Sequence, residues 1–328
     1  MKAAWFEKFG NAVEVFKVGE FETPKPKEHE VLVKLYTSGI NPSDTKKRAG
    51  VSPALLDAGP IIPHSDGAGI IEAVGAGVST TRVGDHVWIY NAQYRRQHGT
   101  AAEYIALDSS QAVWMPEDTR FDVGACLGIP AMTAHRCVTA DGPVDGQTIL
   151  VTGGAGRVGH YAIQWAKHLG AIVIATASSE ESKEQCINAG ADLITGHPGK
   201  ESSQAIIEFT KGAGVDRIVE GEFGGNLNNI LDVLKTNGII ATYASMAQPT
   251  PEIPFYQMMY KDITIRLVIV YAMPEMAKNK ASKDITDCLK NGVLKHRIAY
   301  TLPLSEIAKG HQLNEEGDFT GCVVLKCE

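Results

Sequence analysis

Short runs in which apolar and polar residues alternate fill the first third of the chain. The clearest are EVLVKLYT, AGIIEAVG, DHVWIY and AAEYIALD, and glycine and proline residues interrupt the sequence between them. A period of two predicts half-buried strands, and strands at this density without helical patterns between them indicate a compact β-rich domain. We place this domain at residues 1–120.

From residue 121 to 263 the pattern changes to apolar runs that alternate with helical periodicity. The runs TILVTG, AIVIATA, DLITG, DRIVEG and IIATYAS are separated by segments such as VGHYAIQWAKHLG and NLNNILDVLKTNG. This alternation predicts a parallel, doubly wound sheet with helices on both faces. TILV and AIVIA are apolar throughout, as strands buried on both faces are.

The tail returns to short strand patterns. TIRLVIV and TGCVVLKC flank one helical pattern near Lys280 to Asn291. A β-rich ending after an α/β middle indicates that residues 264–328 go back to the first domain. The expected fold class is therefore α/β, with a Rossmann-like domain at residues 121–263 and a second, β-rich domain built from both ends of the chain.

Composition narrows the range of functions. The formal net charge is −7, which argues against nucleic acid or an anionic membrane as the main partner. The six cysteines show no paired spacing, so reduced thiols and a cytoplasmic location are expected. No apolar segment approaches the length of a membrane span, and the N-terminus MKAAWFEKFG lacks the features of a signal peptide.

The segment TILVTGGAGRVG contains three glycines with G-x-G-x-x-G spacing. It follows a buried-strand pattern directly and opens a helical pattern, which is the context that a dinucleotide-binding loop requires. Such a loop brings its backbone close to a pyrophosphate at a helix N-terminus. The alternative is a glycine-rich turn without a ligand. The expected phosphate-binding residues are Gly154, Ala155, Gly156, Arg157, Val158 and Gly159.

The end of the next strand indicates which dinucleotide binds. NAD sites carry an acidic residue about 20 residues after the glycines, where it bonds the ribose 2′-hydroxyl. Here Ser178 and Ser179 occupy that place, and Lys183 follows. Hydroxyl and ammonium groups suit a 2′-phosphate, so NADPH is the expected cofactor. Glu180 and Glu181 leave NADH open, because either carboxylate could bend back to a 2′-hydroxyl.

Several stretches together resemble one known family. GINPSDTKKRAG, PHSDGAGIIEAVGAGV, VGDHVW, GTAAEY, GIPAMTAHR, GGAGRVG and FTGCVVLK occur in the order typical of the medium-chain dehydrogenase/reductase superfamily. The similarity spans nearly the whole chain and is greatest to the quinone oxidoreductase (zeta-crystallin) branch. The resemblance implies a GroES-like catalytic domain beside the Rossmann domain.

The resemblance also bears on metal binding. Zinc alcohol dehydrogenases of this superfamily carry a cysteine where this chain has Asn41, and a metal-binding His-Glu pair where it has Ser65 and Asp66. Zinc needs thiolate or imidazole ligands, and the first 125 residues contain no cysteine. We therefore expect no metal site. His64 stands one residue from the ligand place, and we interpret it as a packed or exposed loop histidine.

Without zinc, an easily reduced acceptor such as a quinone or an activated alkene is expected. In the family, the asparagine at the Asn41 position lies near the nicotinamide, which implies a hydrogen-bond donor to the oxygen that gains charge. The alternative for Asn41 is a turn residue in an Asn-Pro turn. Thr133 resembles the family's threonine beside the nicotinamide. Lys46 and Ser52 stand where quinone reductases often have aromatic residues, which leaves the acceptor open.

The family also suggests cofactor contacts beyond the glycine loop. VEGEFGG ends the fourth strand of the Rossmann pattern and TYAS ends the fifth, at the carboxyl edge where open α/β sheets bind ligands. Core packing is an equal alternative for the phenylalanine in the first of these segments. The residues expected from these positions are His197, Phe223, Ala244 and Ser245.

The sequence thus predicts a zinc-independent NADPH:quinone oxidoreductase-like enzyme. One alternative is an NADPH-dependent enone or 2-alkenal reductase. Another is an NADPH-binding protein without catalysis, crystallin-like or RNA-binding, although the acidic charge argues against RNA. The expected partners are a small-molecule quinone or enone and, by family resemblance, a second copy of the chain in a homodimer.

Overall fold

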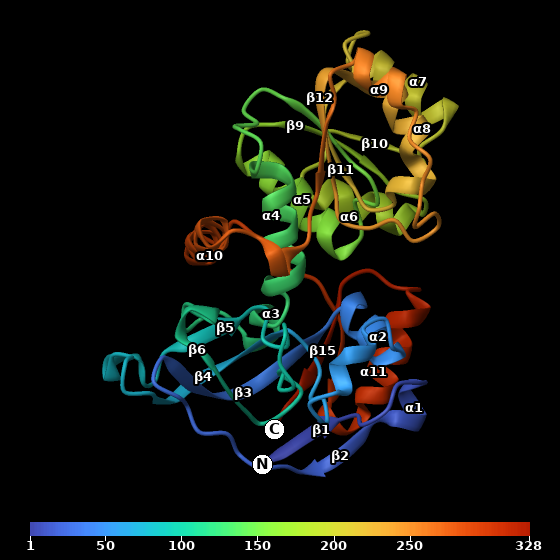
Figure 1. Cartoon of the computed structure of the whole chain (residues 1–328). Helices are drawn as coiled ribbons and strands as arrows, with labels where there is room; N and C mark the ends of the chain where they lie inside the picture. Colours follow the sequence, from blue (N-terminus) through green and yellow to red (C-terminus); the bar gives the residue numbers. More distant parts are fainter. The chain divides into compact units, whose positions relative to one another are not determined.

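The computed structural model describes residues 1–328 and divides the chain into two compact units. The first unit contains residues 1–129, 282–292 and 296–328, and the second contains residues 130–281 and 293–295. Each is described by itself below, and both can be followed in Figure 1.

A seven-stranded sheet forms the core of the first unit. Its strand order is β14-β15-β3-β4-β5-β7, and β6 also pairs with β3. All neighbours are antiparallel except β14 and β15. A separate pair is formed by β1 and β2. The strands are β1 (Lys2–Trp5), β2 (Lys17–Glu20), β3 (Glu30–Ile40), β4 (Asp66–Val74), β5 (His86–Ile89), β6 (Tyr104–Asp108), β7 (Ala112–Trp114), β14 (Ile298–Pro303) and β15 (Cys322–Lys326).

Strand β3 carries much of the packing in this unit, whose helices are short. Strand β3 alternates exposed and buried residues over its first half and is buried throughout its last four residues, where it runs into the interior. Its buried side chains Val31, Val33 and Leu35 pack with Ile71 of β4 and Ile105 of β6. The helices are α1 (Ala12–Val15), α2 (Pro42–Ala49), α3 (Phe121–Gly124) and α11 (Ile307–Glu316).

The second unit contains a six-stranded sheet in which every neighbouring pair is parallel. The strand order is β10-β9-β8-β11-β12-β13. The strands are β8 (Thr148–Val151), β9 (Ile172–Thr176), β10 (Leu193–Thr195), β11 (Val215–Glu220), β12 (Leu234–Thr242) and β13 (Thr264–Leu267). The doubly wound parallel sheet expected from the sequence is therefore confirmed.

Helices follow the strands of this sheet, and α4, α5 and α6 pack together while α7 and α8 form a separate pair. They are α4 (Met132–Thr139), α5 (Arg157–His168), α6 (Glu180–Ala189), α7 (Lys200–Phe209), α8 (Phe223–Val233) and α9 (Phe255–Tyr260). Helix α10 (Glu275–Lys290) contains the point at which the chain passes from the second unit back to the first.

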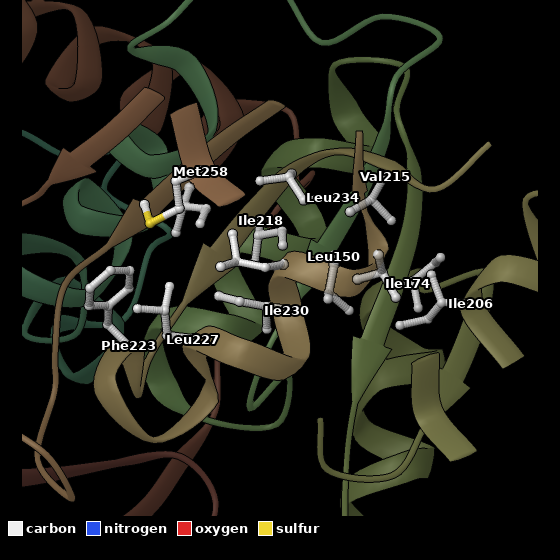
Figure 2. Close-up of a cluster of buried hydrophobic side chains, with 13 residues drawn as sticks. Leu150, Ile174, Ile206, Val215, Ile218, Phe223, Leu227, Ile230, Leu234 and Met258 are labelled. Carbon is white, nitrogen blue, oxygen red and sulfur yellow. The ribbon is translucent and has the colours of Figure 1, made fainter. Parts of the chain in front are cut away.

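One apolar cluster joins this sheet to α7, α8 and α9. Ile218 and Leu150 of the central strands lie near Ile230 of α8, and Ile174 of β9 lies beside Ile206 of α7 (Figure 2). Met258 of α9 belongs to the same cluster. Complete burial of an aliphatic side chain contributes about 1.5–3 kcal/mol to stability, so this cluster holds the strand order in place. The order reverses between β8 and β11, and in such sheets ligands bind at the carboxyl ends of the strands beside that point.

The structure differs from the sequence prediction in two places. TIRLVIV was assigned to the first domain, but Thr264–Leu267 pairs in parallel with β12 and completes the second sheet. The chain therefore returns to the first unit later than residue 264. The Asn-Pro turn after β3 is also more ordered than expected, because helix α2 starts at Pro42 directly after Asn41.

None of the helices combines the length and the apolar character that crossing a bilayer requires.

Candidate active site

Asn41 is the single residue between strand β3 and helix α2. It has the extended backbone of a helix N-cap, and its N–H donates to Oδ2 of Asp44 at 2.8 Å. Proline at the first helical position suits this start, because its missing N–H would have no partner there. The main chain of Asn41 is thus fixed from both sides, and its side chain is only 4% exposed.

The carboxamide of Asn41 contacts a buried carboxyl group. Its Nδ2 donates to Oδ2 of Asp66 at 2.8 Å, and the N–H of Ile129 donates to the same oxygen at 2.8 Å. Asp66 is the first residue of β4 and is completely buried. In the sequence, Asp66 stands out only as the replacement of a metal-binding glutamate, and nothing in the pattern indicates that it pairs with Asn41.

The surroundings of Asp66 disfavour its charged form. Burial raises the pKa of this carboxyl well above its usual value, and the hydrogen bonds from Ile129 and Asn41 act in the opposite direction. Asp44 and Cys322 raise the pKa further through like charge. The hydrogen bonds donated by Ile129 and Asn41 stabilise the carboxyl group in this buried site.

His64 lies in a buried polar chain in the same unit. Its Nδ1 is 2.8 Å from Oγ of Ser38, and its Nε2 is 2.9 Å from Nε2 of His311. Oγ1 of Thr100 uses its one hydrogen to donate to the carbonyl of Asp66, so it accepts from Oγ of Ser38, 2.8 Å away. Because Ser38 gives its hydrogen to Thr100, it accepts from Nδ1 of His64. His64 therefore carries its proton on Nδ1 and accepts from His311. Of the two interpretations of His64, the structure shows the packed histidine.

These histidines predict a loss of stability in acid. Burial lowers the pKa of His64 to about 3 and that of His311 well below its usual value. Below about pH 6.5 these two histidines bind protons in the unfolded chain but not in the folded chain. Each of them therefore lowers the free energy of unfolding by about 1.4 kcal/mol for every unit by which the pH falls further. Denaturant unfolding at pH 7.5, 6 and 5 should show this decline.

The variant His64→Asn should flatten that pH dependence. Asparagine tolerates the positive φ of 78° found at this residue and retains a polar side chain. The matched control is His29→Asn, because the side chain of His29 is exposed. Equal pH dependence in His64→Asn and the parent protein would contradict the assignment.

The glycine loop in the second unit has the shape that a dinucleotide site needs. Gly156 caps α5, and its N–H bonds the carbonyl of Gly153 at 2.9 Å. A Cβ at Gly159 would overlap the carbonyl of Gly153, and a Cβ at Gly154 would come within 2.8 Å of Ala175 on β9. The left-handed turn is made by Gly153 (φ 60°), which lies just before the motif and was not among the predicted residues. The structure thus has the close helix–sheet packing of such loops.

The residues expected to recognise the ribose follow strand β9. Ser178 and Ser179 are exposed, and Ser179 caps α6 by accepting the N–H of Ser182 at 3.1 Å. Nζ of Lys183 lies 2.6 Å from Oε1 of Glu180 in a surface ion pair. The cation and the competing carboxylate are therefore neighbours on one helical turn.

A pocket of about 390 Å³ lies at the carboxyl ends of β11, β12 and β13. Three predicted residues line it together: Phe223, Ala244 and Ser245. The N–H of Phe223 bonds the carbonyl of Ala244 at 2.9 Å, which joins two strand ends into one wall. The end of β13 was not predicted as part of this site, because the sequence pattern placed that strand in the other domain. The rest of the lining is formed by Thr242, Tyr243, Pro249, Pro251, Leu267, Val268 and Ile269.

Other predicted residues lie outside this pocket. Thr133 is in the first turn of α4 and is 5% exposed, and His197 is exposed after β10.

Comparison with protein families and curated sequences identifies relatives along the chain. Residues 27–117 match the alcohol dehydrogenase GroES-like domain, and residues 158–286 match the zinc-binding dehydrogenase family. A quinone oxidoreductase of Pongo abelii is 32% identical over 319 residues, covering 93% of this chain and 94% of its own length. The chain belongs to the zinc-independent quinone oxidoreductase branch of the medium-chain dehydrogenase/reductase superfamily. The expected family and fold class are confirmed.

Further relatives widen the range of chemistry in this family. A 2-haloacrylate reductase of a Burkholderia species is 27% identical over 314 residues, covering 93% of both chains. A mycobacterial quinone oxidoreductase superposes with a TM-score of 0.89 at 27% identity, covering 99% of both chains. A mycobacterial protein solved in complex with NADPH gives a TM-score of 0.86, also at 27% identity and 99% coverage of both chains.

The residues at the ligand places of zinc dehydrogenases do not fit zinc. Asn41 offers an amide that is bonded to Asp66, and Ser65 offers a hydroxyl. Both ring nitrogens of His64 have partners, and the structure contains no group of three histidine, cysteine or acidic residues arranged around a common point for a metal. We expect elemental analysis of protein prepared without chelator to find far less than one zinc per chain. A stoichiometric zinc content would contradict this prediction.

Proposed function

We propose that this protein is an NADPH-dependent oxidoreductase that transfers a hydride to a quinone or an activated alkene without zinc. The observation that carries the proposal is the edge of the second sheet, where a glycine loop of dinucleotide-binding shape and an apolar pocket lie at the carboxyl ends of the strands. The NADPH complex of the mycobacterial neighbour supports the same cofactor.

Each part of that edge has a separate task. The backbone from Gly154 to Gly159 holds the pyrophosphate at the start of α5, and Ser178, Ser179 and Lys183 receive the 2′-phosphate. His197 contacts the adenosine side. The bound cofactor supplies the hydride, and the protein supplies binding and orientation.

The pocket formed by Phe223, Ala244 and Ser245 suits the nicotinamide half of the cofactor, because its walls are largely apolar and its polar groups come from strand ends. Thr133 contacts the same half of the cofactor. In the first unit, Asn41 donates a hydrogen bond to the acceptor oxygen that gains negative charge as the hydride arrives.

A parallel assay distinguishes the candidate hydride acceptors. NADPH oxidation is followed with purified protein against a quinone, a 2-alkenal and an enone in parallel, with NADH as the second cofactor. Turnover with the quinone supports the quinone oxidoreductase function. Turnover restricted to the enal and the enone favours the alkene reductase, and the 2-haloacrylate reductase relative supports this alternative. NADPH binding without any turnover favours the non-catalytic alternative.

The cytoplasmic location expected from the sequence stays a prediction.

We also propose that the protein forms a homodimer through the edge of the second sheet. Strand β13 is the last in the sheet, and Leu267 is 77% exposed on it. On the neighbouring helix α9, Tyr256 and Tyr260 are also exposed. An exposed edge strand offers unpaired backbone groups to a second chain.

Light scattering after size exclusion should give the mass of two chains. The variant Leu267→Lys should shift the protein toward monomer, whereas Ile187→Lys on the exposed face of α6 should not. A monomeric parent protein would contradict the dimer.

A further inference from the structure

A buried carboxyl group controls which side of the Asn41 carboxamide faces outward. Asp66 accepts from Nδ2 of Asn41 and from the N–H of Ile129, and no further partner of Asn41 is found for the second hydrogen on Nδ2. We propose that Asp66 is a positioning residue that holds the carboxamide with Nδ2 turned inward, so that this second N–H is presented to the acceptor oxygen. The inference rests on the proposed function, in which Asn41 is that donor.

The orientation follows from hydrogen-bonding chemistry. Nδ2 of Asn41 lies 2.8 Å from Oδ2 of Asp66, and this oxygen also accepts the N–H of Ile129, so the amide nitrogen of Asn41 faces an acceptor. Turning the amide over would remove this donor from a completely buried oxygen. The backbone of Asn41 cannot move to relieve this, because its N–H is bonded to Asp44.

Asp66 is itself fixed by the sheet. Strand β4 begins at Asp66, and the register pairs Asp66 with Gly39, two residues before Asn41 on β3. The absence of a side chain at Gly128 makes room for the carboxyl group, since a Cβ there would overlap Oδ1 of Asp66. The carboxyl therefore has one place to lie, and that place is beside the junction of β3 and α2.

A stabilising role alone does not account for this arrangement. Burial raises the pKa of Asp66, which shows that the charged form is unfavourable in this site. Buried charges that are not used for specificity are often replaced by apolar residues at no loss of stability. What Asp66 provides, and an apolar residue of its size does not, is a fixed acceptor for one face of the Asn41 amide.

The variant Asp66→Asn tests the orientation because it preserves shape and exchanges an acceptor for a donor. Ile129 donates to both carboxyl oxygens of Asp66, so an amide at residue 66 can keep this bond with its oxygen at the place of Oδ1 and turn its N–H toward Asn41. The Asn41 carboxamide is then expected to turn over and present its oxygen to the acceptor. We expect kcat with an enal to fall about 10- to 100-fold, since small misplacements of a reacting group have effects of this size. The dissociation constant of NADPH should stay within twofold.

A double-mutant comparison separates positioning from structure. Because Asp66 acts through Asn41, the pair Asn41→Ala and Asp66→Asn together should be no slower than Asn41→Ala alone. The control is Asp216→Asn. The carboxylate of Asp216 accepts the N–H of Thr148 at 2.8 Å, so this variant also removes an acceptor of a backbone N–H, but at the other end of the second sheet. It should change the melting temperature without changing kcat.

NMR of protein labelled with ¹⁵N-asparagine gives a readout that is independent of turnover. One side-chain proton of Asn41 should be protected from exchange in the parent protein and not in Asp66→Asn. Multiplicative rate losses, unchanged kcat in Asp66→Asn, or equal exchange in both proteins would overturn the inference while leaving the proposed function intact. Full activity of Asn41→Ala, or a parent protein that reduces no acceptor, would overturn the function and the inference together.

Discussion

Replacing Asn41 by alanine is expected to lower kcat and kcat/KM with an enal or an enone by about 10²–10³-fold, the usual loss on removing one oxyanion donor. Both constants should fall together, because the hydrogen bond is made mainly in the transition state. A quinone is already a strong acceptor, so its rate should fall less. Affinity for NADPH should hardly change, because the residues that we propose to bind the cofactor belong to the second unit.

Stability must be separated from catalysis in this experiment. Asn41 is the N-cap of α2 and its carboxamide bonds the buried Asp66, and leaving such a buried acceptor without its donor costs about 1–3 kcal/mol of folding free energy. The control is Asn11→Ala, because Asn11 is also an N-cap but is exposed and makes no side-chain capping bond. Asn41→Ala should melt earlier and lose activity, whereas Asn11→Ala should keep both its melting temperature and its activity. An Asn41→Ala enzyme with unchanged rates and KM values on every acceptor would leave Asn41 as a helix cap and no more.

Much of the fold follows from local patterns in the sequence. Strands such as TILV are apolar throughout because both faces of the parallel sheet are covered, and the glycine loop is readable because its spacing is set by backbone geometry within one turn. Strand β13 was misplaced for a physical reason. It is an edge strand in which no residue is fully buried, so it lacks the continuous apolar pattern of the central strands.

The candidate site was less accessible to sequence reasoning. The contact between Asn41 and Asp66 joins residues that are far apart in the chain, and only the register of β3 against β4 brings them together. The same holds for the pocket at the strand ends, whose lining comes from three strands and the loop after β12. Residue types indicated the chemistry, and the pairing of the strands determined which residues meet.

Helix α6 shows that a predicted ligand can also be a helix cap. The hydroxyl of Ser179, expected to bind a 2′-phosphate, accepts the N–H of Ser182 and lies 3.0 Å from the hydroxyl of that residue. Lys183 is the one predicted ligand of the 2′-phosphate with a positive charge. The preference for NADPH should therefore depend chiefly on Lys183.

The variant Lys183→Glu is accordingly expected to lower kcat/KM with NADPH by about 10- to 150-fold, since one charge-assisted hydrogen bond contributes about 1.5–3 kcal/mol. It also adds a negative charge beside Glu180 and Glu181, which repels a phosphate and suits a ribose hydroxyl. The value with NADH should change little or rise, so the cofactor preference should shrink or reverse.

The control for this exchange is Lys309→Glu. Lys309 pairs with Glu306 three residues before it, as Lys183 pairs with Glu180, but on a helix of the first unit. Exposed pairs of this kind contribute only about 0.2–1 kcal/mol, so losing either ion pair cannot itself account for a large kinetic change. If Lys183→Glu lowers kcat/KM equally with both cofactors, or no more than Lys309→Glu does, Lys183 does not bind the 2′-phosphate. If the parent enzyme already uses NADH as well as NADPH, Glu180 or Glu181 holds the ribose in its place.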